Sequence, residues 1–269
     1  MNIKETESYA KDLRKLIVEM THNVGKKGVH IASALSVADM LAVLYNDVLK
    51  YDPQNGDAED RDFFVLSKGH AYTALYAVLC KAGYCTEEEL YANFMVDNGL
   101  FPVHPVKNTA RGIEFSGGSL GTGVSFAVGK ALALRTRGKA NKVYTLLGDG
   151  ECNEGSVWEA LVSAAHLKLD NLTIIIDCNK LQQDGETQEV LNMDLESMAK
   201  SAGLETIAID GHDCQQIYDA LTKATEGKPK CIIANTVKGK GISFIENNNQ
   251  FHHAFLTEKQ YAKAAEELN

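Results

Sequence analysis

The sequence predicts an α/β fold, in which a mostly parallel sheet carries helices on both faces. Two apolar runs, at 143–147 and 172–176, are short enough to be buried strands. Between them, apolar residues recur at helical spacing over 157–167. A strand, a helix and a second strand in this order predict a βαβ unit, whose strands run parallel and whose polar tips share one edge of the sheet.

The chain before this unit predicts mainly helices. A glycine-bearing loop at 25–30 separates the first two, and the block 60–70 predicts a short strand that enters a tight glycine turn. Residues 116–123 are dense in glycine and fit either a flexible loop or a phosphate cradle. The predicted helices are 6–21, a helix capped near Ser36, 71–81, 86–93 with a capping box from Thr86 and Glu89, and a helix ending near Arg137.

The chain after this unit continues the alternation of helices and strands. A polar stretch follows Asp184, and we expect a structural role for His212, which lies in a turn. The segment KGKG predicts a mobile loop, whose Lys238 and Lys240 are either solvated or drawn to phosphates. The predicted elements are a helix at 195–201, a strand at 205–209, a helix at 216–225, a strand at 231–236 and a helix at 258–268.

Length and composition indicate one soluble domain over residues 1–269. The chain is 45% hydrophobic, and no apolar run approaches the length of a membrane span. The first residues do not resemble a signal peptide, so we expect a cytoplasmic protein without membrane association. A formal charge of −9 and scattered Lys and Arg residues argue against a nucleic-acid partner. The six cysteines show no zinc spacing, and we expect reduced structural thiols.

The polar tips of the βαβ unit indicate a site for a metal and a phosphate. Asp149 follows the first strand in a Gly-Asp-Gly turn, and Asn179 follows the second. Ligands of open α/β sheets bind beyond these strand ends, and a helix amino terminus favours phosphate. Because a carboxylate alone would repel a diphosphate, we expect Mg2+ between them, with the Asn179 amide oxygen and a nearby backbone carbonyl as further ligands. Gly150 lets the backbone approach the ligand closely.

This pattern resembles the GDG…N signature of thiamine diphosphate enzymes, and the segment EGSVWEALVSAAHLKLDNL is similar to transketolases in particular. The resemblance covers nearly the whole chain and implies a domain that binds the diphosphate end of the cofactor. It implies that Asp149, Asn179 and the carbonyl of Leu181 bind Mg2+, a place that Ca2+ or Mn2+ could also take. It also implies that Gly150 and Glu151 contact the cofactor.

The resemblance gives roles to four histidines, each of which is weak evidence of a functional site when taken alone. His30, a loop histidine by itself, corresponds to a substrate-facing histidine, although its Ala-Ser-x-Leu context looks more like 1-deoxyxylulose-5-phosphate synthases. His70 lies at a strand-to-helix junction in Ser-Lys-Gly-His and corresponds to a histidine on the diphosphate. His104 corresponds to a contact for the donor hydroxyls. His252, rather than His253, corresponds to the histidine that meets diphosphate and substrate.

Other residues match the family less uniformly. The resemblance places Gly118, Ser119 and Leu120 along the thiazolium and pyrimidine of the cofactor. Gln183 stands where these families usually have an aliphatic residue against the thiazolium, and a buried amide without a partner would cost about 1–3 kcal/mol. Lys180 stands where Gly or Asn is common. Glu154 and Glu159 are either solvated charges or members of the network that links two active sites across a subunit interface in transketolases.

The resemblance implies a thiamine diphosphate- and Mg2+-dependent transfer of a two-carbon ketol unit from a ketose phosphate to an aldose phosphate, as in the pentose phosphate pathway. The sequence ends after the diphosphate domain, whereas a complete transketolase continues into two more domains. We therefore expect the amino-terminal subunit of a split transketolase, with a separate carboxyl-terminal subunit in an α2β2 assembly, and no ketol transfer by this chain alone.

Two alternative functions remain open from the sequence. One is a related thiamine-dependent enzyme, such as a deoxyxylulose-phosphate synthase, an α subunit of a 2-oxo acid dehydrogenase or a transketolase for an unusual sugar. The other is a regulatory subunit that kept the fold and lost the cofactor. Asp149, Asn179 and the histidines argue against the second alternative, while Gln183 and the residues after His30 favour it.

Overall fold

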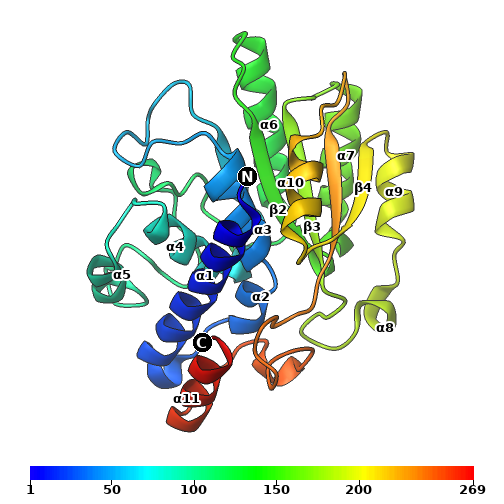
Figure 1. Ribbon diagram of the computed structural model, residues 1–269. Helices are drawn as coiled ribbons and strands as arrows, with labels where there is room; N and C mark the ends of the chain where they lie inside the picture. Colours follow the sequence, from blue (N-terminus) through cyan, green and yellow to red (C-terminus); the bar gives the residue numbers. More distant parts are fainter.

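A computed structural model describes all 269 residues of the chain. The strands are β1 (Phe63–Leu66), β2 (Val143–Gly148), β3 (Leu172–Cys178), β4 (Glu205–Asp210) and β5 (Lys230–Asn235). They form a five-stranded sheet in the order β1-β2-β3-β5-β4, in which every neighbouring pair is parallel (Figure 1). The predicted α/β class with a parallel sheet is confirmed.

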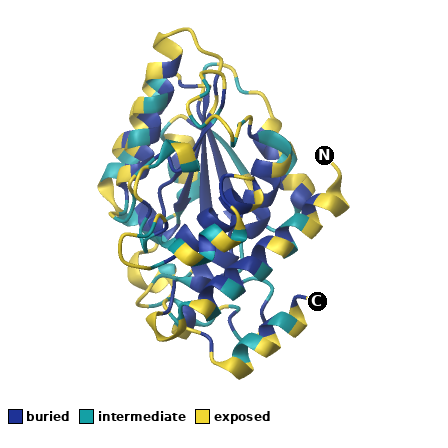
Figure 2. Ribbon diagram, turned by 90° about the vertical axis from the view of Figure 1, so that its left-hand side faces the viewer, coloured by how far each residue is buried: buried dark blue, intermediate teal, exposed yellow.

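Helices cover both faces of this sheet. One face carries α1 (Ile3–Asn23), α2 (Ile31–Leu35), α3 (Ala38–Val43), α4 (Tyr72–Lys81), α10 (Cys214–Thr222) and α11 (Glu258–Glu267). The other carries α6 (Thr122–Thr136), α7 (Gly155–His166) and α9 (Leu195–Ser201). Because strand side chains alternate, Ile175 packs into the first layer, while Ile174 and Ile176 pack into the second. Figure 2 shows the strands as the buried centre between these layers.

Short helices and turns connect the main elements. The helix α8 (Thr187–Leu191) lies in the polar stretch after Asp184, where the sequence predicts no element. Its lack of buried residues explains why no apolar periodicity marks it. The remaining short elements are α5 (Glu87–Asn93), a π-helical turn at Leu44–Val48, and 3-10 turns at Gly25–Lys27, Gly69–Ala71, Thr109–Arg111, Gly150–Asn153 and Asn249–Phe251.

The carboxyl ends of β2 and β3 meet at one edge of the sheet. Gly148 is the register partner of Asp177, so the chain leaves both strands at the same level. Asp149 and Asn179 then follow side by side, as the βαβ order predicts. The backbone supports this arrangement, because the Asp149 N–H donates to the Asp177 carbonyl at 3.1 Å.

Two predicted helix caps differ from the structure. The helix predicted to begin near Ser36 is divided into α2 and α3, and the Ser36 side chain caps neither. The cap prediction is wrong because Ser36 is buried and its hydroxyl donates to Asp177 Oδ2 at 2.8 Å. Thr86 does cap α5, by accepting from the Glu89 N–H. The reciprocal bond of the capping box is absent, because Arg111 holds the Glu89 carboxylate.

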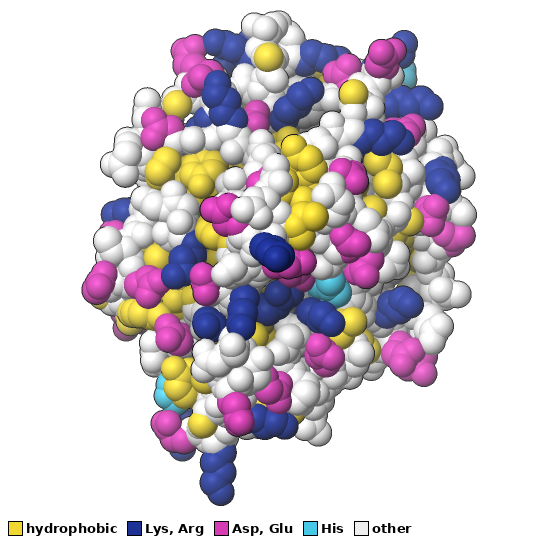
Figure 3. Space-filling model, viewed as in Figure 1, with side chains coloured by type: hydrophobic (Ala, Val, Ile, Leu, Met, Phe, Trp, Pro, Cys, Tyr) yellow, Lys and Arg dark blue, Asp and Glu magenta, His cyan; other side chains and the backbone are white.

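Several composition-based expectations can be compared with the structure. All six cysteines are free and buried, as expected for structural thiols. No helix combines the length and the apolar character that crossing a bilayer would require. On the face seen in Figure 3, Lys and Arg side chains are intermingled with Asp and Glu side chains rather than gathered in one basic surface.

A buried ion pair joins α1 to α3. Arg14 donates to both carboxylate oxygens of Asp39, at 2.9 and 2.5 Å, and both residues are buried. His212 Nδ1 lies 2.7 Å from the same carboxylate, while its Nε2 accepts from the Val237 N–H at 2.8 Å. Because a backbone N–H only donates, the imidazole proton lies on Nδ1 and is donated to Asp39. This arrangement agrees with the structural role expected for His212.

Replacing Arg14 with Met is expected to lower the free energy of unfolding by about 3 kcal/mol, because Asp39 then stays buried without its cation. Urea denaturation measures this loss. Lys15→Met is the matched control, since Lys15 is the next residue of α1 and is only half-buried. A loss in R14M no larger than the loss in K15M would contradict the importance of the pair.

Candidate functional site

A cavity of about 160 Å³ lies beyond the carboxyl ends of β1, β2 and β3. Its predicted lining residues are His70, Leu120, Asp149, Gly150, Glu151, Asn179, Leu181, Gln183 and His252. Lys238, predicted only as a candidate for phosphate binding, also lines it. Sequence reasoning missed Ser33, Lys68, Gly148 and Gln182, which complete the wall. The position of Lys68 between a strand and the His70 turn was a usable signal, because that junction is where phosphate sites form.

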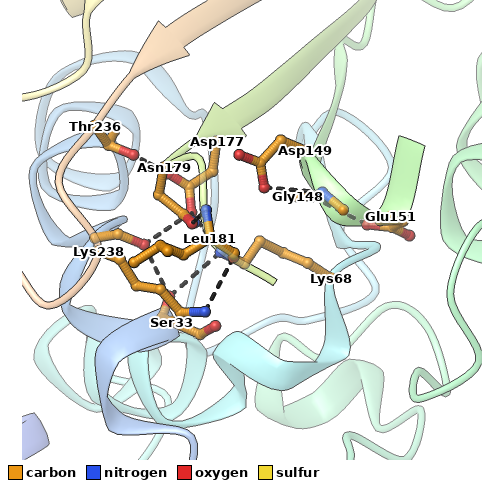
Figure 4. A network of polar contacts seen from close by, with 12 residues as sticks. Ser33, Lys68, Gly148, Asp149, Glu151, Asp177, Asn179, Leu181, Thr236 and Lys238 are labelled. Carbon is orange, nitrogen blue, oxygen red and sulfur yellow. Dashed lines mark hydrogen bonds and ion pairs between the residues drawn. The ribbon is translucent and has the colours of Figure 1, made fainter. Parts of the chain in front are cut away.

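A buried ion pair between Lys68 and Asp177 lies beside this cavity (Figure 4). Lys68 Nζ is 2.5 Å from Asp177 Oδ2, and Asp177 has no exposed surface. The same carboxylate accepts from the hydroxyls of Ser36 and Thr236 and from the Asn179 amide. Burial opposes ionisation of Asp177, but Lys68 and these donors hold its pKa below the ordinary value. The carboxylate is therefore ionised and fully paired.

Asp177 also determines which way the Asn179 amide points. Asn179 Nδ2 donates to Asp177 Oδ2 at 2.9 Å. An ionised carboxylate can only accept, so the NH2 group must face Asp177 and the amide oxygen must face away. That oxygen accepts only from the Leu181 N–H, at 3.2 Å, which leaves a lone pair for a ligand. The structure thus presents the amide oxygen that the sequence predicts as a metal ligand.

Asp149 is held by backbone groups rather than by a cation. Its two oxygens accept from the N–H groups of Gly150, at 2.8 Å, and Lys180, at 2.6 Å. Burial, together with the charge of Asp177, raises the pKa of Asp149 to about 6. Lys180 reaches this position with φ +65°, a left-handed conformation that costs a non-glycine residue about 1–2 kcal/mol. This explains why Gly or Asn would suit position 180.

Lys238 points into the cavity from a loop that the structure holds firmly. Its side chain is only 1% exposed, and Nζ donates to the Leu181 carbonyl at 3.0 Å and to His252 Nδ1 at 3.2 Å. Burial and the nearby Lys68 lower the pKa of Lys238 to about 8. The sequence left open whether the two lysines of this loop are solvated or drawn to phosphates. Lys238 is turned toward the candidate phosphate site, whereas the Lys240 side chain is 40% exposed to solvent.

The four predicted histidines converge. The ring centroid of His30 lies 4.7 Å from that of His70, 6.3 Å from that of His104 and 5.4 Å from that of His252. His253 joins this group, with its ring 4.7 Å from His30. The sequence resemblance favoured His252 over His253, whereas the structure brings both together. No group of three or more His, Cys, Asp or Glu side chains has a geometry that could hold a metal ion.

Three imidazoles of this group, those of His30, His70 and His252, are neutral near pH 7. Burial and the neighbouring imidazoles lower the pKa of His30 to about 3. Burial with nearby histidine and lysine charges lowers the pKa of His70 and of His252 to about 4. Since the Lys238 ammonium only donates, His252 Nδ1 accepts and the His252 proton lies on Nε2. The Nδ1 atoms of His30 and His104 are buried without a hydrogen-bond partner.

The glycine-rich loop packs against the His70 turn. Gly118 has φ +130°, and a Cβ on Gly69 would come within 2.8 Å of the Gly118 nitrogen, so this contact requires glycine. Leu120 lines the cavity, whereas Ser119 is exposed and does not. Glu151 supports the loop, because its carboxylate accepts from the Ser67 hydroxyl and the N–H groups of Gly121 and Gly148.

The other predicted site residues lie away from the centre of the cavity. Gln183 lines the rim and is exposed, so the predicted cost of a buried amide does not arise in this chain. Gln182 instead packs against Gly150, where an added Cβ would come 2.9 Å from Gln182 Cγ. Glu154 precedes α7 and Glu159 lies on it; both are exposed and outside the cavity. Their role at a subunit interface stays a prediction.

A larger cavity of about 880 Å³ lies behind the Asn179–Leu181 segment, beyond the carboxyl ends of β4 and β5. It is polar and open, and it contains none of the four predicted histidines. The smaller cavity is the better candidate site, since it alone combines Asp149 and Lys238 with the imidazoles of His70 and His252. His30 and His104 do not line it and adjoin it through the rings of His70 and His252.

Two charged side chains that face the smaller cavity, Asp149 and Lys238, form no ion pair within the chain. Asp149 accepts only from backbone N–H groups, and Lys238 donates only to carbonyl oxygens and an imidazole. A cation beside Asp149 and an anion beside Lys238 would compensate both. The Asp149 carboxylate, the Asn179 amide oxygen and the Leu181 carbonyl are oxygen ligands of the kind that Mg2+ prefers. These residues therefore fit a divalent cation that carries a diphosphate.

Comparison with known proteins agrees with this chemistry. Residues 6–269 match the family described as "Transketolase, thiamine diphosphate binding domain". The chain is 40% identical over 270 residues to a subunit of the apulose-4-phosphate transketolase of Actinobacillus succinogenes, with 100% of this chain and 97% of that protein covered. It is also 40% identical over 268 residues to the 6-deoxy-6-sulfo-D-fructose transketolase subunit SqwG of a Clostridium species, with 98% and 96% covered.

The fold agrees with a solved transketolase. The crystal structure of the Campylobacter jejuni enzyme superposes with a TM-score of 0.93 at 34% identity, covering 100% of this chain and 43% of that one. The family match spans almost every residue, and the cavity lies at the sheet edge where the βαβ unit predicts phosphate binding. The chain therefore belongs to the transketolase family, as a thiamine diphosphate-binding domain.

Proposed function

We propose that the chain is the amino-terminal subunit of a split transketolase, which transfers a two-carbon ketol unit from a ketose phosphate to an aldose phosphate. The observation that carries this proposal is the pair of uncompensated charges, Asp149 and Lys238, in one cavity beside four convergent imidazoles. Within a thiamine diphosphate-binding domain, these charges suit a metal-bound diphosphate. A regulatory subunit that had lost the cofactor would have no reason to keep them.

Each polar group has a distinct role in this proposal. Asp149, the Asn179 amide oxygen and the Leu181 carbonyl would hold Mg2+. Lys238 would offset the charge of the diphosphate, with the further lining residues His70 and His252 as donors to phosphate oxygens, while Gly150 would let the backbone approach the diphosphate closely. When bound, thiamine diphosphate supplies the carbon nucleophile and holds the transferred unit.

The imidazoles suit hydrogen bonding to sugar hydroxyls. His30 and His104 each have a ring nitrogen without a partner, so both retain hydrogen-bonding capacity for a substrate. His252 donates through Nε2 while Lys238 occupies Nδ1. His30 and His252 are neutral at pH 7, so their imidazoles can donate hydrogen bonds to sugar oxygens or accept them from sugar hydroxyls.

We propose that the site is completed by a separate carboxyl-terminal subunit, in an α2β2 assembly. Two relatives that match over nearly their whole length are named as subunits, and this chain covers 97% and 96% of them, against 43% of the C. jejuni transketolase. The cavity of about 160 Å³ is also smaller than the roughly 300 Å³ at which ligand pockets usually begin. Exposed Glu154 and Glu159 would lie at the interface between copies.

An unusual sugar is the second candidate substrate. Two relatives that match over nearly their whole length are named for apulose 4-phosphate and for 6-deoxy-6-sulfo-D-fructose. Such names favour donors outside the pentose phosphate pathway. Both substrate classes present a ketol group to the same cavity, so the roles proposed for its residues are the same for either.

The chain co-purified with its carboxyl-terminal partner is expected to transfer ketol units with thiamine diphosphate and Mg2+, while the chain alone is inactive. Asp149→Ala is expected to reduce the rate by about 100-fold or more, because a metal ligand is removed. The assay uses xylulose 5-phosphate, sulfofructose and apulose 4-phosphate as donors. Asp184→Ala, in the exposed loop beyond the cavity, is the control and should keep full activity. Equal activity of D149A and D184A would refute the proposed metal site.

The contribution of His30 to the stability of the chain is expected to fall as the pH falls from about 6.5 toward 4. His30, with a pKa of about 3, is neutral in the folded state and protonated in the unfolded state over this range. The unfolded chain then binds more protons, so the stability present above pH 6.5 declines on acidification. Urea unfolding at pH 7, 6 and 5 measures the slope, which should be shallower in His30→Asn than in His166→Asn, an exposed control. Equal slopes would argue against a neutral His30.

A further inference from the structure

Lys238 is a buried cation with no carboxylate partner. Its Nζ contacts the Leu181 and Gln182 carbonyls, at 3.0 and 3.4 Å, and His252 Nδ1, at 3.2 Å. Lys230 is also buried and donates to carbonyls, but those carbonyls, of Ala220 and Leu221, belong to the last turn of α10, where a helix favours a cation. No helix end stabilises Lys238 in this way.

The loop that carries Lys238 is fixed, so only the side chain is free to move. The Val237 N–H donates to His212, and the Gly239 N–H donates to the Ala32 carbonyl at 3.0 Å. The Lys238 carbonyl accepts from the Asn247 N–H at 2.9 Å. The lysine side chain has four rotatable bonds, which let the ammonium reach several positions in the cavity from this fixed backbone.

The carbonyl that Lys238 occupies is the same one that the proposed metal requires. Leu181 and Asn179 belong to one turn, and Asp149 contacts this turn directly, because its carboxylate accepts from the Lys180 N–H at 2.6 Å. A metal ion and an ammonium group at one carbonyl oxygen would repel each other strongly in this buried place. The ammonium must therefore leave Leu181 when a metal binds there.

We propose that Lys238 takes the place of the metal at the Leu181 carbonyl in the unloaded chain, and that its ammonium moves to the diphosphate when the metal and the diphosphate enter together. The inference rests on the proposed function, because it concerns the same site. Lys68 cannot make this exchange, since Asp177 holds its ammonium at 2.5 Å. Metal alone displaces Lys238 without offering it an anion, so bare metal binds weakly.

The test measures the dissociation constant of Mn2+ by equilibrium dialysis, with bare Mn2+ and with the preformed Mn2+-pyrophosphate complex. Wild-type chain is expected to bind the complex at least about tenfold more tightly than bare Mn2+. Lys238→Met should bind bare Mn2+ several-fold more tightly than wild type, and its preference for the complex should fall at least tenfold. Lys238→Arg, which keeps a cation, should retain much of the preference.

Lys240→Met is the matched control, because Lys240 lies on the same loop and its side chain is 40% exposed. It should behave as wild type. Circular dichroism and thermal unfolding establish that each variant is folded. If K238M does not fold, a crystal structure of the wild-type chain with Mn2+ and pyrophosphate is the deciding experiment. The inference requires Lys238 Nζ to have moved from the Leu181 carbonyl to a phosphate oxygen. Lys238 Nζ still bound to that carbonyl would overturn the inference.

The outcomes separate this inference from the proposed function. If wild type binds Mn2+-pyrophosphate and K238M shows the same affinities and the same preference, the site stands and the exchange by Lys238 is refuted. If wild type, with or without its carboxyl-terminal partner, binds neither Mn2+ nor its pyrophosphate complex, the proposed function fails and the inference fails with it.

Discussion

The buried ion pair between Lys68 and Asp177 is the interaction on which the rest of the site depends. A carboxylate with no exposed surface is stable only if its charge is matched and its lone pairs are used. Asp177 meets both conditions through Lys68, Ser36, Asn179 and Thr236. These partners come from the ends of three strands and from the turn between α2 and α3. Satisfying one carboxylate therefore aligns four distant segments and orients the Asn179 amide.

The charges around this pair divide into those that the chain satisfies and those that it leaves for a ligand. Arg14 and Asp39 compensate each other, as Lys68 and Asp177 do. Asp149 and Lys238 are as buried as those residues, yet neither has an oppositely charged partner. Uncompensated charge in a protein interior is costly, and it persists where binding later removes the cost. The contrast distinguishes the functional site from the structural ion pairs.

The parts of the fold that could be predicted are those that local pattern decides. The apolar runs of β2 and β3, the helix between them and the turn glycines encode the βαβ unit, and parallel pairing follows from the helical crossover. Asp149 and Asn179 were therefore predictable as neighbours. Ser36 was not, because a serine before an apolar run looks like a cap, and only the position of Asp177 shows that its hydroxyl is used elsewhere. Lys238 was left undecided for the same reason.

By itself, the sequence determined the α/β class, the edge of the sheet that binds ligands and the resemblance that gave four histidines a role. Tertiary structure alone decided that Lys238 rather than Lys240 faces the cavity, which way the Asn179 amide points, and that His253 joins the other imidazoles. The physical reason is the sequence distance over which each kind of interaction acts. Strand and helix patterns depend on neighbours within a few residues, whereas burial, charge compensation and hydrogen-bond direction depend on partners such as Lys68 and Asp177, 109 positions apart.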